Sequence, residues 1–139
     1  METATASNST ATKSVFVVED SVPVRARLIN WLETIRGVEV VGQAATPVDA
    51  VIGILRAQPA YVVLDFQLEA GTGTDVLRAV REQVPQTVFI VLTNHAEPQF
   101  QRACMEVGAD AFFDKSTELG KVKDLIARGL GRNAKEDSR

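Results

Sequence analysis

The fold is decided by the stretch Tyr61-Val62-Val63-Leu64-Asp65, in which four apolar residues run directly into a carboxylate. A continuous apolar run of this kind is typical of a strand that is buried on both faces of a sheet. The carboxylate then lies at the carboxyl end of the strand, which is the edge where ligands bind in open α/β sheets. The stretch therefore predicts an α/β protein with a polar site at one edge of its sheet.

Three further apolar runs also end in polar residues that can bind a metal ion or a phosphoryl group. They are 15–18 before Glu19 and Asp20, 88–92 before Thr93 and Asn94, and 111–113 before Asp114 and Lys115. If these strands are parallel neighbours, acids, a hydroxyl and an ammonium converge on one spot. Taken one by one, the same residues can also be helix caps, turn residues or a solvated loop pair.

Strands and helices alternate along the chain, which indicates βαβ units and a parallel sheet. The predicted strands are 14–18, 38–44, 61–64, 87–92 and 111–113, and the predicted helices are 23–36, 74–84, 98–107, 117–130 and one that begins at Pro47. Ser21 and Thr46 are expected N-caps, each followed by a proline in the first turn. We expect a doubly wound five-stranded parallel sheet in the flavodoxin-like order 2-1-3-4-5, with helices on both faces.

The composition predicts one globular domain at residues 14–130, with a disordered leader at 1–13 and a polar tail at 131–139. The net charge of −3 gives no support for nucleic-acid binding through a basic surface. No apolar stretch approaches the roughly 18 residues that a membrane span needs. The lone Cys104 cannot form an internal disulfide, which suits a reducing cytoplasm.

The strand-end residues are suited to phosphoryl chemistry. Glu19, Asp20 and Asp65 would repel one another if clustered, and Mg²⁺ would relieve this because it prefers oxygen ligands. A carboxylate can attack phosphorus to give an aspartyl phosphate. Lys115 can then pair with the phosphoryl group, and the Thr93 hydroxyl can donate a hydrogen bond to it.

At these residues the chain resembles the receiver domains of two-component response regulators, over residues 14 to about 130. The matching motifs are Val15-Phe16-Val17-Val18-Glu19-Asp20-Ser21, Val62-Val63-Leu64-Asp65-Phe66-Gln67-Leu68 with Gly73 downstream, Val91-Leu92-Thr93, and residues 108–116. The resemblance implies that Asp65 accepts a phosphoryl group from a histidine kinase or phosphotransfer protein. It implies Mg²⁺ held by Glu19 or Asp20, by Asp65 and by the backbone carbonyl of Gln67. It also implies that Thr93 and Lys115 contact the phosphoryl group, and that Phe112 is the switch aromatic.

On this reading the protein is a cytoplasmic phosphoacceptor switch rather than an enzyme. Its output would be the binding of an unidentified protein, because no DNA-binding module follows Leu130 in the sequence. A homodimer through the helix after Pro98 or through the last helix is a further expectation. A fragment of a longer regulator remains an alternative.

The sequence departs from the receiver pattern beside the acceptor. Glu69 stands where many receivers have proline, and Asn94 and His95 follow the hydroxyl residue where the family usually has a small residue first. We expect Gln67, Asn94 and His95 to set the lifetime of the phosphoryl group. The alternative for His95 is a surface loop residue with no role.

Two other functions are alternatives to a receiver domain. A haloacid-dehalogenase-type phosphatase normally has a second aspartate at the position of Gln67, and a nucleotide- or flavin-binding module has only the weak pattern Gly71-x-Gly73 in its favour.

Overall fold

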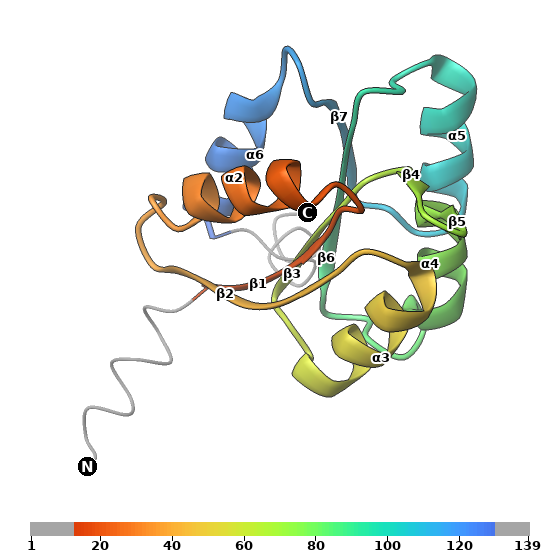
Figure 1. Cartoon of the computed structure of the whole chain (residues 1–139), viewed down its shortest axis with the longest axis horizontal. Helices are drawn as coiled ribbons and strands as arrows, with labels where there is room; N and C mark the ends of the chain where they lie inside the picture. Colours follow the sequence, from red (N-terminus) through yellow and green to blue (C-terminus); the bar gives the residue numbers. More distant parts are fainter. Residues whose placement is uncertain (1–12, 130–139) are drawn as a thin grey trace, which may run out of the picture.

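A five-stranded parallel sheet forms the centre of the computed structural model, which describes residues 13–129 (Figure 1). In spatial order its strands are β2 (Val38–Ala44), β1 (Lys13–Val18), β3 (Tyr61–Leu64), β6 (Val88–Thr93) and β7 (Ala111–Asp114). All four neighbouring pairs are parallel. Counted along the chain, these strands have the order 2-1-3-4-5, so the predicted topology is confirmed.

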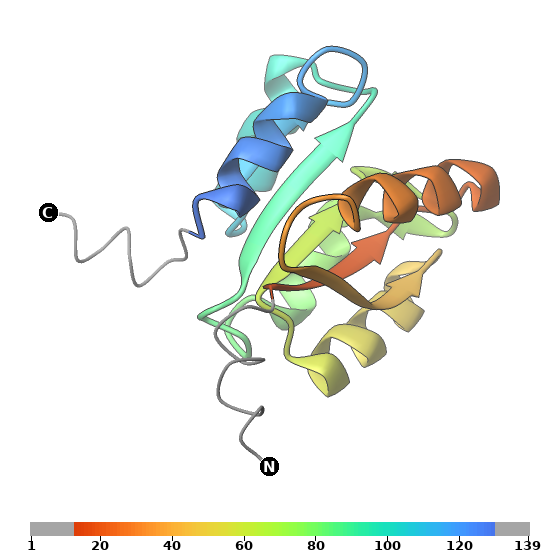
Figure 2. The same cartoon turned by 90° about the vertical axis from the view of Figure 1, so that its left-hand side faces the viewer.

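Five helices cover the two faces of the sheet (Figures 1 and 2). They are α2 (Val22–Leu32), α3 (Pro47–Ala57), α4 (Gly73–Val80), α5 (Pro98–Glu106) and α6 (Leu119–Ala127). Successive strand residues point to opposite faces of the sheet, so the strands contribute side chains to two apolar cores, one on each face. Val62 and Leu64 pack with α3, α4 and α5, whereas Tyr61 and Val63 pack with α2 and α6. The fully apolar β3 is therefore buried on both sides, as its sequence predicted.

The predicted N-caps are also confirmed. Ser21 accepts a hydrogen bond from the Val24 N–H at 3.3 Å, and Thr46 accepts one from the Asp49 N–H at 3.2 Å. Helix ends differ more from the prediction, because α2 stops at Leu32 rather than residue 36 and α4 stops at Val80 rather than residue 84. In both cases the residues that follow form turns. The helical spacing of apolar residues in the sequence thus continues for several residues after the regular helix has ended.

A two-stranded hairpin follows Asp65 and was not predicted. It pairs β4 (Gln67–Leu68) with β5 (Gly71–Thr72) in antiparallel register. Its turn places Ala70 at a φ of 67°, a left-handed conformation that is uncommon for a residue with a side chain. Thr72 then caps α4 in a reciprocal pair with Asp75. The loop beside the strand-end carboxylate is thus a defined hairpin tied to the next helix.

The predicted leader and tail lie outside the described residues, except for Lys13, which begins β1. The end of the last predicted helix at Leu130 also lies outside them. Within residues 13–129, none of the helices has the length and the apolar character needed to cross a lipid bilayer.

The Phe16 ring is enclosed by two glycine backbones, one on β2 and one on α3. A Cβ atom built on Gly42 would lie 2.5 Å from Cε2 of this ring, and one built on Gly53 would lie 2.4 Å from its Cζ. Phe16 is only 3% exposed, so its ring has little room to move away from an added side chain at either glycine. The absence of side chains at both positions therefore allows α3 to pack against β1 and β2.

We predict that Gly53→Ala destabilises the protein by about 1–3 kcal/mol, the typical cost of overpacking a core. Helix propensity alone predicts the opposite, a gain of about 1 kcal/mol. Gly120→Ala is the matched control, since a Cβ on Gly120 meets nothing within 4 Å and should stabilise α6. Chemical denaturation of both variants tests the prediction, and a stabilised Gly53→Ala variant would contradict it.

Candidate functional site

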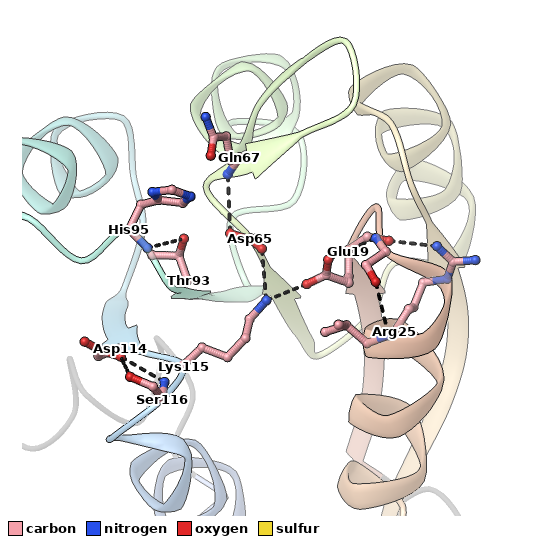
Figure 3. A network of polar contacts seen from close by, with 11 residues as sticks. Glu19, Arg25, Asp65, Gln67, Thr93, His95, Asp114, Lys115 and Ser116 are labelled. Carbon is pink, nitrogen blue, oxygen red and sulfur yellow. Dashed lines mark hydrogen bonds and ion pairs between the residues drawn. The ribbon is translucent and has the colours of Figure 1, made fainter.

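The Lys115 ammonium lies between two carboxylates at the carboxyl edge of the sheet (Figure 3). Its Nζ donates to Glu19 Oε1 at 2.6 Å and to Asp65 Oδ2 at 3.0 Å. The three side chains are largely buried, with exposures of 16% for Lys115, 4% for Glu19 and 11% for Asp65. Three segments that are distant in the sequence therefore meet in one charged cluster.

The charge state of the cluster follows from burial and pairing. Burial raises the pKa of Glu19 above its ordinary 4.5, although the bond from Lys115 and the Ser21 N–H oppose this rise. Burial acts to lower the pKa of Lys115, but its bonds and attraction to the two carboxylates prevail and raise that pKa above 10.5. The ammonium therefore keeps its proton at neutral pH and partly neutralises two neighbouring acids.

Backbone hydrogen bonds fix the strand ends that carry these groups. The Asp65 N–H donates to the Val18 carbonyl at 3.1 Å, which continues the β1–β3 ladder to Asp65. The Lys115 N–H donates to the Thr93 carbonyl at 2.9 Å, so β6 aligns the lysine. Thr93 is fully buried, and its Oγ1 accepts the His95 N–H at 3.1 Å. Thr93 thus belongs to the same edge as Asp65 and Lys115.

The Asp65 carboxylate is also fixed on its other side. Its Oδ1 accepts the Gln67 N–H at 3.3 Å, while the Gln67 side chain is exposed. Gly73 lies close beneath this loop, since a Cβ built there would be 2.6 Å from the Asp65 carbonyl oxygen. Helix α4 can approach the loop only because residue 73 has no side chain.

The remaining predicted site residues lie around this cluster rather than within it. Asp20 is half-buried, and among residues 13–129 its carboxylate has no protein hydrogen-bond partner or ion pair. Asn94 is exposed and lines, with Lys115, a groove between α2 and α6. The His95 side chain is exposed. Phe112 is half-buried and packs on the core beneath α3, α4 and α5.

Asp114 faces away from the cluster although it precedes Lys115. Its Oδ1 accepts the N–H and the hydroxyl of Ser116, at 2.8 and 2.6 Å, and these bonds lower its pKa. The Asp114 N–H donates to Glu118 Oε1 at 2.8 Å. These bonds shape the turn between β7 and α6, and the turn directs Lys115 inward.

The donors at this edge suit a hard cation in part. Within residues 13–129, no three His, Cys, Asp or Glu side chains are arranged to hold a metal ion. Mg²⁺ does not need such a cage, because it typically takes one or two carboxylates and keeps several waters. Lys115 already shows that Glu19 and Asp65 accept a positive charge between them. The carboxylate chemistry of the edge therefore fits Mg²⁺.

Arg25 is a residue of this edge that the sequence analysis missed. Its Nη1 donates to the Glu19 carbonyl at 2.7 Å, and its Nε donates to Gln43 Oε1 at 2.7 Å. The only signal in the sequence was a basic residue in the first turns of the helix that follows the acids. Nothing in the sequence indicated that this residue would bind a backbone carbonyl.

The model of the response regulator receiver domain matches residues 15–127 of this chain. The chain belongs to the response regulator receiver domain family. Phosphorylation of an aspartate and binding of Mg²⁺ are typical of this family, whose members are regulatory modules of two-component systems. The match does not favour the alternative of a haloacid-dehalogenase-type phosphatase.

Similar proteins agree with this assignment. The photosynthetic apparatus regulatory protein RegA of Cereibacter sphaeroides is 33% identical over 121 residues, which cover 86% of this chain and 64% of RegA. The response regulator protein VraR of Staphylococcus epidermidis is 24% identical over 114 residues, which cover 82% of this chain and 54% of VraR. The chain thus spans only about half to two thirds of the length of these relatives.

Solved structures share the fold. A NarL signal receiver domain from Mycobacterium tuberculosis superposes with a TM-score of 0.76 at 28% identity, covering 86% of this chain and 98% of that chain. A LuxR-family response regulator from Aurantimonas has a TM-score of 0.78 at 24% identity, covering 90% and 94%. A solved complex of CheX and CheY from Borrelia burgdorferi contains BeF₃ and Mg²⁺, with a TM-score of 0.70 at 23% identity, covering 81% and 88%.

We predict that Lys115→Met lowers the free energy of unfolding by about 3 kcal/mol at pH 8, because it leaves two buried carboxylates without their counter-ion. The loss should shrink as the pH falls toward 4. Glu19, whose pKa is already raised, takes up a proton there and ceases to repel Asp65. In the wild type, the stabilising contribution of Lys115 is lost as the pH rises through its raised pKa, above 10.5, and it also declines at acid pH as Glu19 becomes protonated.

Denaturant unfolding at several pH values measures this difference. Lys121→Met is the control, since Lys121 pairs with Glu118 at 2.8 Å on the exposed surface of α6. That change should cost no more than about 1 kcal/mol at any pH. A Lys115→Met penalty that is independent of pH would show that repulsion between the two carboxylates is not its cause.

Proposed function

We propose that this protein is a phosphoacceptor switch in which Asp65 receives a phosphoryl group from a phosphohistidine. The donor is a histidine kinase or a histidine phosphotransfer protein, in keeping with the receiver family. A carboxylate oxygen of Asp65 forms the new O–P bond as the N–P bond of the phosphohistidine breaks. The imidazole leaves with the electron pair and takes up a proton, so the product is an aspartyl phosphate.

The observation that carries this proposal is the contact of Lys115 with Asp65. Phosphoryl transfer needs little covalent chemistry from the protein, so catalysis depends on positioning and on cations near the phosphoryl oxygens. An ammonium 3.0 Å from Asp65 Oδ2 is already beside the oxygen atoms that would carry the phosphate. The Thr93 hydroxyl, buried at the neighbouring strand end, is our candidate for a hydrogen-bond donor to the same group.

For Mg²⁺ we propose Glu19 or Asp20, Asp65 and the backbone carbonyl of Gln67 as ligands. The support is the oxygen chemistry of these groups and their position on adjoining segments at one edge. When bound, Mg²⁺ neutralises charge on the phosphoryl oxygens. The residues of the chain then have distinct tasks, since Asp65 supplies the nucleophile and Lys115 stabilises the negative product.

We propose that phosphorylation changes a protein-binding surface near Phe112. Lys115 follows Phe112 by three residues, so a phosphoryl group on Asp65 that draws Lys115 away from Glu19 acts on the end of β7. Phe112 is half-buried and can therefore respond to a change in its surroundings without crossing the core. The output partner is a protein, while the net charge of −3 offers no basic surface for nucleic acid. The cytoplasm, where kinases act on receivers, is the proposed location.

Incubation of the chain with Mg²⁺ and acetyl phosphate tests the acceptor. The wild type should gain the mass of one phosphoryl group in an intact-mass measurement, and Asp65→Asn should gain none. Asp124→Asn is the control, because Asp124 is an exposed acid on α6 that, in the described part of the chain, makes no hydrogen bond or ion pair with Glu19, Asp65 or Lys115. It should be phosphorylated like the wild type. An undiminished adduct on Asp65→Asn, or no adduct on the wild type, would contradict the proposal.

We further propose that Asn94, with Gln67 and His95, sets the phosphoryl lifetime. Asn94 is exposed and lines a groove with Lys115, whose ammonium contacts Asp65, so we propose that its side chain restricts the approach of water. Asn94→Ala should speed dephosphorylation on the order of fivefold, which corresponds to roughly 1 kcal/mol in the barrier. The decay of the adduct after removal of the donor measures the rate. Gln99→Ala, an exposed change on α5, is the control, and equal rates for wild type and Asn94→Ala would count against the role of Asn94.

A further inference from the structure

We propose that Arg25 positions the acidic pair Glu19 and Asp20 for Mg²⁺ by holding the peptide group between them. The inference rests on the proposed binding of Mg²⁺ at this edge and adds a residue that does not touch the ion. Arg25 lies on α2, and its guanidinium reaches back over the end of β1 (Figure 3). It is thus a positioning residue rather than a ligand.

The guanidinium replaces a donor that the sheet cannot supply. The Glu19 N–H bonds to the Ala44 carbonyl at 3.0 Å, but β2 ends at Ala44 and the ladder goes no further. The Glu19 carbonyl lies just beyond β1, which ends at Val18, and belongs to a residue that is only 3% exposed. Arg25 Nη1 donates to that carbonyl at 2.7 Å. A buried carbonyl that would otherwise lose its partner is thereby satisfied.

This bond holds the loop that carries both acids. The peptide group that joins Glu19 to Asp20 includes the carbonyl that Arg25 binds, so Arg25 limits its rotation. The Ser21 N–H bonds to Glu19 Oε2 at 3.0 Å and fixes the Glu19 side chain. Asp20 has no such side-chain partner within residues 13–129. The direction of its Cα–Cβ bond is set by the backbone, and Arg25 holds the peptide group that precedes it.

A second bond anchors the guanidinium itself. Arg25 Nε donates to Gln43 Oε1 at 2.7 Å, and Gln43 lies on β2. Two N–H donors of the planar Arg25 guanidinium thus bind one residue just after β1 and one residue on β2. The ammonium of a lysine cannot hold two acceptors in such a fixed geometry. Arg25 is consequently held between two strands rather than resting loosely over the acids.

The charge of Arg25 and its positioning role predict opposite effects on the affinity for Mg²⁺ when the guanidinium is removed. A guanidinium near the acids repels an incoming cation, so loss of its charge alone would tighten the binding of Mg²⁺. Loss of a group that orients the ligands weakens metal binding, commonly by 10–100-fold when it contacts the ligand side chains. Here the contact is through the backbone, and we expect a dissociation constant about tenfold higher for Arg25→Gln.

Titration of the ¹⁵N-labelled full chain with MgCl₂ measures this constant from the amide shifts of residues 19–21 and 65–67. Arg27→Gln is the matched control, because it removes the same charge from the same helix, and it should bind Mg²⁺ as tightly as the wild type or slightly tighter. Arg25→Lys and Gln43→Ala each keep part of the arrangement and should fall between wild type and Arg25→Gln. Thermal unfolding without Mg²⁺ reports the structural cost separately.

A folded Arg25→Gln variant that binds Mg²⁺ as well as the wild type, or better, overturns the inference. If Arg25→Gln does not fold, Arg25→Lys and Gln43→Ala decide, and wild-type affinity in both overturns it. A wild-type chain that binds no Mg²⁺ contradicts the proposed metal site and this inference together. Phosphorylation of Asp65 in the intact-mass experiment remains a separate result, so the failure of one is distinguishable from the failure of the other.

Discussion

The edge of the sheet depends on one ammonium held between two buried carboxylates. Lys115 bonds to Glu19 and Asp65, which precede it by 96 and 50 residues. Taking three charges out of water is costly, and only close pairing offsets that cost. The pairing is close because backbone bonds from Asp65 to β1 and from Lys115 to β6 align the segments first. The charged cluster therefore depends on the parallel sheet, which places the three charged groups within hydrogen-bonding distance.

Much of the fold could be predicted because its signals are local. The apolar run 61–64 and the pairs of cap and proline at Ser21 and Thr46 determine structure through their own backbone and neighbours. The hairpin after Asp65 gave no such signal, since a left-handed Ala70 is uncommon and is held by its surroundings. Helix ends were missed for a related reason. Apolar spacing persists through the turns after Leu32 and Val80, although regular hydrogen bonding does not.

The site was predictable as a set of strand ends but not as a set of contacts. A charge directly after an apolar strand must emerge at the edge, and this locates Glu19 and Asp65, with Lys115 one residue beyond Asp114. The same rule predicts Asp114 and Asp20 as site residues just as it predicts Asp65. Only the structure shows that Asp114 binds its own turn and that Asp20 has no side-chain partner in the described part of the chain. Arg25 escapes prediction altogether, because it acts through a carbonyl whose direction no residue type encodes.

The same cluster that stabilises the fold also constrains its chemistry. The pKa of Lys115 is raised, so its ammonium stays charged between Glu19 and Asp65. Any cation that binds these two carboxylates must therefore compete with Lys115. If Asp65 is phosphorylated as proposed, the added negative charge beside Lys115 would reverse this competition. Lys115 would then leave Glu19 for the phosphoryl oxygens. On the proposed function, the free energy available to move the end of β7 would be the difference between two ways of pairing one lysine, and Lys115, more than Asp65 alone, would be the residue through which the switch acts.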